Sequence, residues 1–270
     1  MIRWIRWTAA ALALAVIAAG FPAAAQTPRV LLRLKIDPGK TLNFNVSGSV
    51  TFSLELNKSQ TTTTAEHSAR EAVRGVRRNP DGSFVVEDAL LDFRVKTEGQ
   101  TQSLPDTRMT LTVRPDGTVV NVTPPHPMDS YPFTLPDHPV AVGDSWTGPV
   151  DEEDSGITIR GTETYTLAAV EPSAGGQVAH IQTRIEGSVA GADLPDLPPD
   201  MKGRFSGSAS GTGTIDWLVN QGRLLQTADT LSIEGTLELT GQNETVKAPM
   251  TVTVTSKEEA APVTPSTSTR

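Results

Sequence analysis

Residues 42–56, LNFNVSGSVTFSLEL, alternate between apolar side chains at even positions and polar side chains at odd positions. A period of two places the apolar groups on one face of an extended chain, so this stretch predicts a half-buried β-strand. Its length exceeds that of an ordinary strand. Gly48 is the one even position without an apolar side chain, and it predicts a bend or a bulge in the strand.

The same alternation recurs along the chain and predicts about ten strands in all. Asn79–Gly82 and Arg114–Gly117 each contain Pro-Asp-Gly, which is typical of a tight turn between antiparallel strands. The predicted fold class is therefore all-β, an antiparallel meander. Strands this long favour a strongly curved sheet, or an open or half barrel, over a compact sandwich. The other main alternating stretches are Val85–Val95 on odd positions, Met109–Val113, Ile157–Ala169, Ala179–Val189, Phe205–Val219, Leu231–Leu239 and Met250–Val254.

The segment Thr63–Arg78 allows two interpretations. Ala65, Ala69 and Val73 recur at helical spacing, and a Thr-x-x-Glu pattern opens the segment, as in a helix capping box. The segment also lies between two turn signals, where a meander needs a return strand. We favour the strand.

The N-terminus reads as a secretory signal peptide over residues 1–25. Arg3 and Arg6 form a basic start, Trp7–Gly20 is almost continuously apolar, and Ala23–Ala25 offers the small residues that a signal peptidase accepts. Cleavage there leaves Gln26 as the new N-terminus. No later apolar run is long enough to cross a bilayer as a helix.

Residues 29–256 are predicted to form a single β-rich domain. The proline-rich stretch at 124–139 is the place where it would divide into two subdomains. Residues 257–270, rich in Pro, Ser and Thr at their end, are predicted to be a disordered tail.

Composition narrows the function classes. The net charge of −8 falls to about −10 once Arg3 and Arg6 leave with the signal peptide. An acidic surface argues against nucleic acid and against anionic lipid headgroups as partners. There is no cysteine, which excludes disulfides, thiolate metal sites and a lipoprotein anchor. We expect a soluble bacterial protein, periplasmic or secreted.

The histidines are the first candidates for chemistry. His126 and His138 lie in the proline-rich loop near Asp129 and Asp137, which suggests a metal or acid–base site. Zinc ligands usually come from rigid elements at short fixed spacing, and this loop offers neither. An exposed polar loop is the favoured interpretation. His67 and His180 have no carboxylate at a suggestive spacing.

Two further patterns resemble sites only superficially. Asp151–Asp154 is dense in carboxylates but lacks the spacing of a calcium loop, so we interpret it as a solvated turn. Gly207–Gly211 is spelled like a serine-hydrolase elbow but has Ala209 at the nucleophile position. We interpret its small residues as positions that let a sheet curve or let a ligand approach the backbone. We expect no catalytic residue, no metal and no cofactor, and hence no enzyme.

Trp146 and Trp217 are the two tryptophans of the mature chain. They could stack on sugars, but in a chain with so few aromatic residues we favour the role of core anchors.

The loop Gly191–Gly203 is the candidate ligand site. Leu194, Leu197 and Met201 stand there among three prolines, and apolar side chains in a loop would be exposed unless they cover something. One hypothesis is that they close a concave sheet around a lipid or another hydrophobic molecule. The alternative is a structural or protein-interaction module of the cell envelope with a filled core and no small-molecule ligand.

Residues 136–146 read Pro-Asp-His-Pro-Val-Ala-Val-Gly-Asp-Ser-Trp. This P-x-x-P-V-x-V-G-D-S-W pattern resembles an uncharacterised family of exported bacterial β-rich proteins, a domain of unknown function. The strand Leu32–Leu34 followed by Gly39, the Asp116-Gly117 turn, and Asp216 with Gly222 are similar too. The resemblance spans Val30–Ser256 and implies a secreted β domain without catalytic residues. Physically, Gly143 and Asp144 would turn and cap the chain, and Trp146 would enter the core at a strand start.

Overall fold

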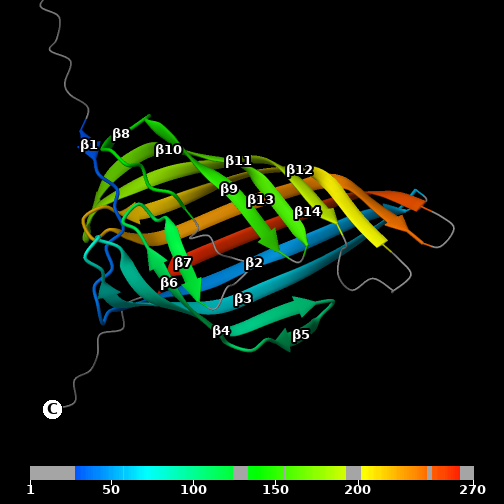
Figure 1. Cartoon of the computed structure of the whole chain (residues 1–270), viewed down its shortest axis with the longest axis horizontal. Helices are drawn as coiled ribbons and strands as arrows, with labels where there is room; N and C mark the ends of the chain where they lie inside the picture. The colour runs from blue at the N-terminus through cyan, green and yellow to red at the C-terminus, as the bar shows by residue number, and fades with distance from the viewer. Residues whose placement is uncertain are drawn as a thin grey trace, which may run out of the picture.

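The computed structural model describes residues 28–56, 58–123, 133–154, 156–192, 202–241 and 245–261. These residues form strands and turns with no helix, in agreement with the predicted all-β class (Figure 1). The strands are β1 (Arg29–Val30), β2 (Thr41–Leu56), β3 (Ser59–Arg78), β4 (Phe84–Thr97), β5 (Gln100–Ser103), β6 (Thr107–Val113), β7 (Val119–Thr123), β8 (Val140–Ala141), β9 (Ser145–Asp154), β10 (Ile157–Ser173), β11 (Gly176–Ala192), β12 (Lys202–Leu218), β13 (Arg223–Thr240) and β14 (Thr245–Ala260).

One antiparallel sheet of 12 strands contains all the strands listed above except the short β1–β8 pair. Its order is β7-β6-β4-β3-β2-β14-β13-β12-β11-β10-β9, with β5 beside β4. The chain runs outward from β2 to the edge strand β7, crosses to the opposite edge at β9, and returns strand by strand to β14. Because β14 pairs with β2, strands from the two halves of the sequence share one sheet.

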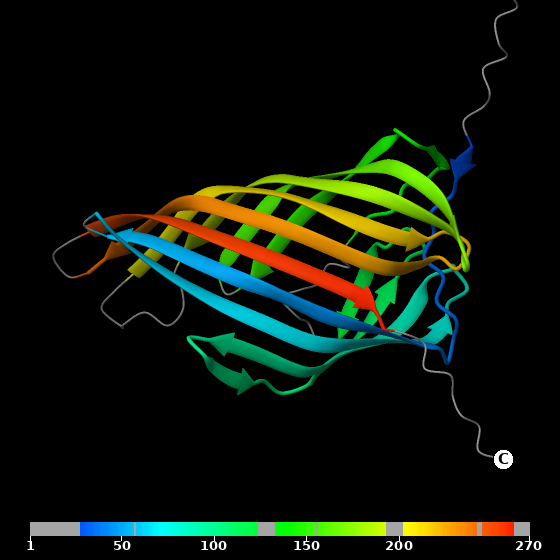
Figure 2. The ribbon, with the colours of Figure 1, turned by 180° about the vertical axis from the view of Figure 1, so that it is seen from behind.

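The sheet is rolled into an open barrel. Figures 1 and 2 show the long strands β2, β3 and β10–β14 curving around a common axis, with the edge strands β7 and β9 on the same side. Within the described residues these two edges are not hydrogen-bonded to each other. The prediction of a strongly curved meander or open barrel is confirmed.

The ambiguous segment is a strand. Residues 63–78 fall within β3, which pairs with β2 from Ser59 to Arg74. Gly48 is not a bulge, because the pairing continues through it on both sides without a register shift. A side chain there is excluded for another reason: a Cβ atom would lie 2.6 Å from the imidazole of His67 on the neighbouring strand.

Two other predictions are corrected. In β4 the even positions Phe84 and Val86 pack in the main core, whereas we expected the odd positions to form the buried face. The phase reverses further along, where β4 has one extra residue beside Arg70 of β3, a β-bulge that shifts the alternation by one. We expected the tail to begin at residue 257, but residues 257–260 belong to β14, which ends at Ala260.

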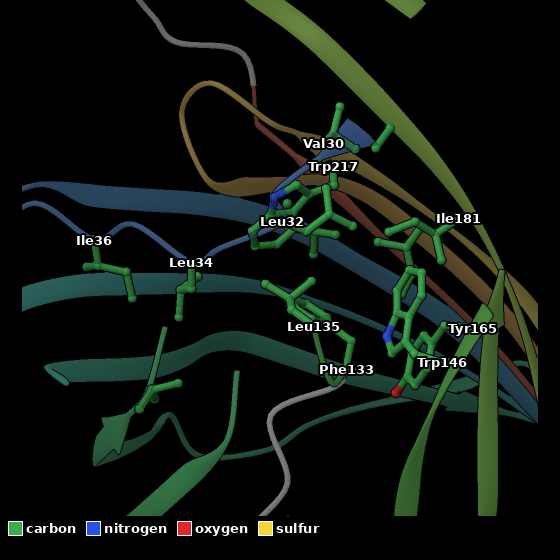
Figure 3. Packing of buried hydrophobic residues seen from close by; sticks show 14 of the residues in the cluster. Val30, Leu32, Leu34, Ile36, Phe133, Leu135, Trp146, Tyr165, Ile181 and Trp217 are labelled. Atoms are coloured by element: carbon green, nitrogen blue, oxygen red, sulfur yellow. The ribbon is translucent and has the colours of Figure 1, made fainter. Parts of the chain in front are cut away.

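One end of the barrel is filled by chain that does not belong to the long strands. Residues 30–36 cross this end with their even side chains inward: Val30, Leu32, Leu34 and Ile36 are at most 8% exposed. Residues 133–140 enter beside them (Figure 3). We call these two segments the plug. Its backbone is tied to the turns at this end, since Leu34 N–H donates to the Pro115 carbonyl at 2.7 Å.

The plug packs around Trp217. The Trp217 indole is fully buried and meets the ring of Phe133 edge-on, with centroids 5.2 Å apart. Trp146 is stacked on Tyr165 at 5.6 Å and donates its indole N–H to the Thr134 carbonyl at 2.7 Å. Both tryptophans are core residues, so the anchor interpretation is confirmed.

The motif at 136–146 folds as its chemistry predicts. Gly143 adopts a φ of 94°, and the Asp144 carboxylate accepts the Ala141 N–H at 3.0 Å. This closes the turn between β8 and β9 and delivers Trp146 to the core. Arg29 forms an ion pair with the same carboxylate at 3.3 Å, which ties the start of the plug to the turn.

Candidate functional site

The inward face of the barrel carries three bands in the same order on several strands. On β13, Leu224 packs in the plug core, Thr227 and Asp229 follow, and Leu231 and Ile233 come next. The neighbouring strand β14 repeats this order, because its residues pair one-to-one with those of β13. Directly paired residues of antiparallel strands point to the same side of the sheet. The interior therefore passes from a filled core through a polar band to a second apolar region.

The second apolar region lines the far half of the barrel, and we call it the trough. Its buried members are Val189, Phe205, Ala209, Leu237 and Met250, and the partly buried residues packed against them are Leu54, Ile157, Ile159, Leu231, Ile233, Leu239 and Val252. They come from β2 and β10–β14. With a rise of 3.3 Å per residue, the stretch from Leu231 to Leu239 is about 26 Å long.

The trough is less well covered than the plug core. Phe52 is 36% exposed although it lies on the trough face, paired with Val252. Leu56 and Val246 are likewise exposed, and they occupy inward positions at the ends of their strands. Apolar side chains on a concave face that remain open to solvent mark a surface able to take an apolar guest.

Glycines make room for the large side chains of the interior. A Cβ atom at Gly235 would lie 2.6 Å from the Phe205 ring, so this ring rests on the neighbouring strand's backbone. The glycine-rich strand β12 serves a similar purpose in the polar band. A Cβ atom at Gly213 would lie 1.8 Å from an Asp229 carboxylate oxygen and 2.7 Å from the Thr183 hydroxyl.

Four carboxyl groups occupy the polar band, and we call them the acidic belt: Asp88 on β4, Glu71 on β3, Glu258 on β14 and Asp229 on β13. Burial, followed by the charges of Glu258 and Asp88, raises the pKa of Glu71 to about 9. At neutral pH Glu71 is therefore protonated and can donate the hydrogen bond that joins it to Asp88. Burial, together with the charges of Asp88 and Asp229, raises the pKa of Glu258 to about 7.

Asp229 completes the belt on β13. Burial raises the pKa of this carboxyl group, and the hydrogen bond from the Thr227 hydroxyl is the main effect that opposes the shift. The Thr227 hydroxyl donates to Asp229 Oδ2 at 2.8 Å. The carboxyl group lies over Gly213, which explains why β12 lacks a side chain at this inward position.

The polar band continues on β10. The Tyr165 hydroxyl donates to Glu163 Oε2 at 2.5 Å and accepts the Thr134 N–H at 3.1 Å. Burial is the first cause that raises the pKa of Tyr165, and the Glu163 carboxylate adds to it. The phenol therefore stays protonated and joins the polar band to the plug.

The predicted ligand loop cannot be placed. Leu194, Leu197 and Met201 lie outside the described residues, as do His126 and Asp129. The strands that flank the loop, β11 and β12, end and begin at the trough end of the barrel, since Gly191 pairs with Phe205.

The remaining histidines lie apart from the trough. His138 Nδ1 lies 2.5 Å from Asp137 Oδ1 in an exposed contact. Contrary to expectation, His180 has a carboxylate partner: the register of β11 and β12 places Asp216 opposite it, with 2.7 Å between Nδ1 and Oδ1. The position directly before it, Ala179, is buried in the core, so His180 faces outward.

A pocket of about 520 Å³ opens on the other face of the sheet. Ala72, Arg74, Glu87 and Ala89 line it, and these positions alternate with inward ones such as Val73. Its Arg74–Glu87 ion pair is half exposed. Asp88 also lines the pocket, so the pocket borders one member of the acidic belt.

Within the described residues there is no group of three or more His, Asp or Glu with the geometry to hold a metal ion. No helix among them is long and apolar enough to cross a membrane.

No family model and no curated protein matches the sequence. Among solved structures, the chain is similar to DynF from the dynemicin biosynthesis pathway of Micromonospora chersina, at 13% identity, 86% coverage of this chain, 85% of that chain and a TM-score of 0.22. It is also similar to a triple mutant of Rhodopseudomonas blastica porin, at 11% identity, 82% and 99% coverage and a TM-score of 0.24. Likeness at this level assigns neither a family nor a function.

Proposed function

We propose that this protein is an exported, non-catalytic binding protein that holds a lipid chain or a similar hydrophobic molecule in the trough. One observation carries the proposal: the concave face at the trough end is apolar, yet Phe52, Leu56 and Val246 on that face stay exposed to solvent. A monomeric soluble protein rarely leaves such a concave apolar surface uncovered without a use for it.

The dimensions of the trough favour an elongated guest. Its length of about 26 Å along β13 is sufficient for an extended long acyl chain. Its lining side chains are aliphatic apart from Phe205 and Phe52, so contact area rather than hydrogen bonding would supply the affinity. Groups that could take part in proton transfer lie in the neighbouring polar band, which supports binding rather than catalysis.

The place of the protein in the cell is part of the same proposal. A signal peptide over residues 1–25 and the absence of cysteine support export to the periplasm or the medium without a lipid anchor. A carrier of an apolar molecule through an aqueous compartment needs a cavity that covers its cargo. An open barrel closed at one end by a plug provides such a shape.

Native mass spectrometry of the purified protein, followed by organic extraction, tests the proposal directly. We expect a bound molecule with a long hydrocarbon portion. After delipidation, the protein should bind the fluorescent fatty acid cis-parinaric acid with one-to-one stoichiometry.

A pair of variants locates the site. Phe52→Asp places a charge on the trough face and should weaken binding of the probe at least about tenfold. Val76→Asp is the matched control, because Val76 is 37% exposed and lies in β3 outside both apolar clusters; its affinity should equal that of the wild type. If the protein is recovered empty and neither variant changes probe binding, the envelope-scaffold alternative replaces the carrier.

A further inference from the structure

Thr183 on β11 carries a buried hydroxyl group that makes no hydrogen bond within the described part of the structure. The residue is 5% exposed. It is directly paired with Tyr165 of the plug core, so its side chain points into the barrel. A buried polar group without a partner destabilises the folded state, and its presence calls for an explanation.

The Asp229 carboxyl group meets this hydroxyl group over the backbone of Gly213. Gly213 is directly paired with Thr183 on one side and with Asp229 on the other. A Cβ atom on Gly213 would lie 1.8 Å from Asp229 Oδ1 and 2.7 Å from Thr183 Oγ1, so the two oxygen atoms converge above a glycine. The second carboxyl oxygen, Oδ2, accepts the Thr227 hydroxyl at 2.8 Å. We call Thr183 Oγ1 and Asp229 Oδ1 the polar pair.

The polar pair lies at the inner end of the trough. The next inward residue of β13 after Asp229 is Leu231, which belongs to the trough. In the opposite direction the strand reaches Leu224 of the plug core. A guest that lies along the trough therefore ends at the polar pair, and its other end points toward the exposed side chains of Leu56 and Val246.

The polar pair favours one chemistry for the inner end of the guest. A hydroxyl group can donate a hydrogen bond to a carboxylate and accept one from a threonine hydroxyl at the same time. A carboxylate can only accept, and it would place a second negative charge beside Asp229 in a partly dehydrated interior. Burial already raises the pKa of the Asp229 carboxyl group, so its surroundings disfavour further negative charge.

We propose that the guest of the trough is a long-chain amphiphile with an uncharged hydroxyl group at one end, and that this hydroxyl group binds between Thr183 Oγ1 and Asp229 Oδ1. The inference rests on the proposed function, because it assigns the chemical class of the molecule held in the trough. The apolar wall contacts the hydrocarbon chain, and the polar pair determines which end enters first. A long-chain alcohol is the simplest molecule of this class.

Two fluorescent probes that differ only at the polar end test the assignment. They are cis-parinaric acid and the alcohol made by reducing its carboxyl group, which have the same chain and the same chromophore. The delipidated protein is titrated with each probe at about pH 8, where the carboxyl group of the acid is ionised. We expect the wild type to bind the alcohol at least about tenfold more tightly than the acid.

Three variants assign the preference to the polar pair. Thr183→Val removes the hydroxyl group but keeps the shape of the side chain, and it should weaken binding of the alcohol about fivefold to tenfold. Asp229→Asn removes the negative charge and should strengthen binding of the acid, which narrows the ratio between the probes. Thr214→Val is the matched control, because Thr214 is exposed on β12; it should bind both probes as the wild type does.

A thermal melt gives a second measurement that needs no probe. Because the Thr183 hydroxyl group is unpaired in the described structure, ligand-free Thr183→Val should melt no lower than the wild type. A melting temperature several degrees lower would show that the hydroxyl group has a partner inside the protein, and it would overturn the proposal.

The titrations separate the assignment of the polar end from the carrier function itself. If the wild type binds both probes equally tightly and Thr183→Val changes neither affinity, the trough holds hydrocarbon chains without distinguishing their polar ends. The carrier then stands and the assignment is wrong. If the wild type binds neither probe, the carrier function is wrong and the assignment fails with it.

Discussion

The plug end and the trough end of this barrel are built from the same strands, yet among the described residues only the plug end is packed by chain from outside those strands. At the plug end, Leu32, Leu167 and Trp217 are fully buried. At the trough end, Ile233 and Val252 are half-buried, and Phe52 is exposed. The difference comes from the two segments that enter the plug, residues 30–36 and 133–140, rather than from the strands themselves. A long alternating strand specifies which face is inward, and chain from elsewhere decides whether that inward face becomes a core or a cavity wall.

The largest effect should follow from removing a plug side chain. Leu32→Ala deletes a fully buried group whose surroundings are fixed by hydrogen bonds, and it should lower the free energy of unfolding by about 3–4 kcal/mol. Ile233→Ala in the trough should cost about 1 kcal/mol, because the side chain is only partly enclosed. Urea unfolding of both variants measures the contrast. Equal losses would mean that the two ends are packed alike and that the trough is not a cavity wall.

The next largest effect on stability should come from Gly213, which lies between the plug and the trough. Gly213→Ala forces the Asp229 carboxyl group and the Thr183 hydroxyl to move, because the new methyl group would overlap the carboxylate. We expect a loss of about 2–3 kcal/mol in unfolding free energy. Gly241→Ala is the control, since no atom lies within 4 Å of its Cβ position and its φ is not positive. Equal free energies of unfolding for Gly213→Ala and Gly241→Ala would contradict the close contact between Gly213 and Asp229.

The acidic belt lies between the plug and the trough, and its contribution to the free energy of unfolding should depend on pH. Single variants of Glu71 and Glu258 separate their two contributions. An unfolded glutamate has a pKa near 4.5, whereas the folded values are about 9 for Glu71 and about 7 for Glu258. The folded state thus retains protons that the unfolded state releases, so stability falls as pH rises from about 4.5 to each folded pKa and is then constant. Glutamine resembles the protonated acid and avoids this loss.

The advantage of Glu258→Gln over the wild type should therefore stop growing near pH 7, and that of Glu71→Gln near pH 9. Between pH 7 and pH 9 only Glu71→Gln should still gain, by no more than about 2–3 kcal/mol, and the contact of both side chains with solvent reduces that amount. Urea unfolding at pH 5, 7 and 9 measures both curves. Two variants that follow one common pH profile would contradict the assignment of separate windows.

The sequence predicted the apolar lining of the barrel interior better than its polar band. Leu231, Ile233 and Leu237 were assigned to the inward face by alternation, and they line the trough. Trp217 was assigned to the core, where it lies. Strand phase is a local property, set by the alternation of side chains, so it can be read without knowing the pairing partners.

The belt was missed because its members look ordinary one at a time. Asp229 occupies the inward phase of Leu231 and Ile233, and Glu258 occupies that of Val252 and Val254. A carboxylate at an inward position of an alternating strand is the signal that could have identified them. Their proximity depends on the pairing of β2 with β14, which joins residues about 200 apart in the chain and which no local pattern specifies.

The smallest effect should come from the turn that delivers Trp146 to the core. Asp144→Ala removes the acceptor of the Ala141 N–H and the partner of Arg29, while the strands on either side keep their hydrogen bonds. We expect a loss of about 1 kcal/mol, because one charged hydrogen bond and one largely exposed ion pair are involved. Asp144→Asn should recover most of it, since the amide oxygen can accept the same N–H. A chain expressed without residues 1–25 carries two tryptophans, both at the plug end, so their fluorescence follows unfolding of this end specifically. Asp144→Ala could instead lower the free energy of unfolding as much as Leu32→Ala. The plug would then depend on the fold of the turn between β8 and β9 rather than on its own apolar contacts, and the contrast between the two ends would have a different cause.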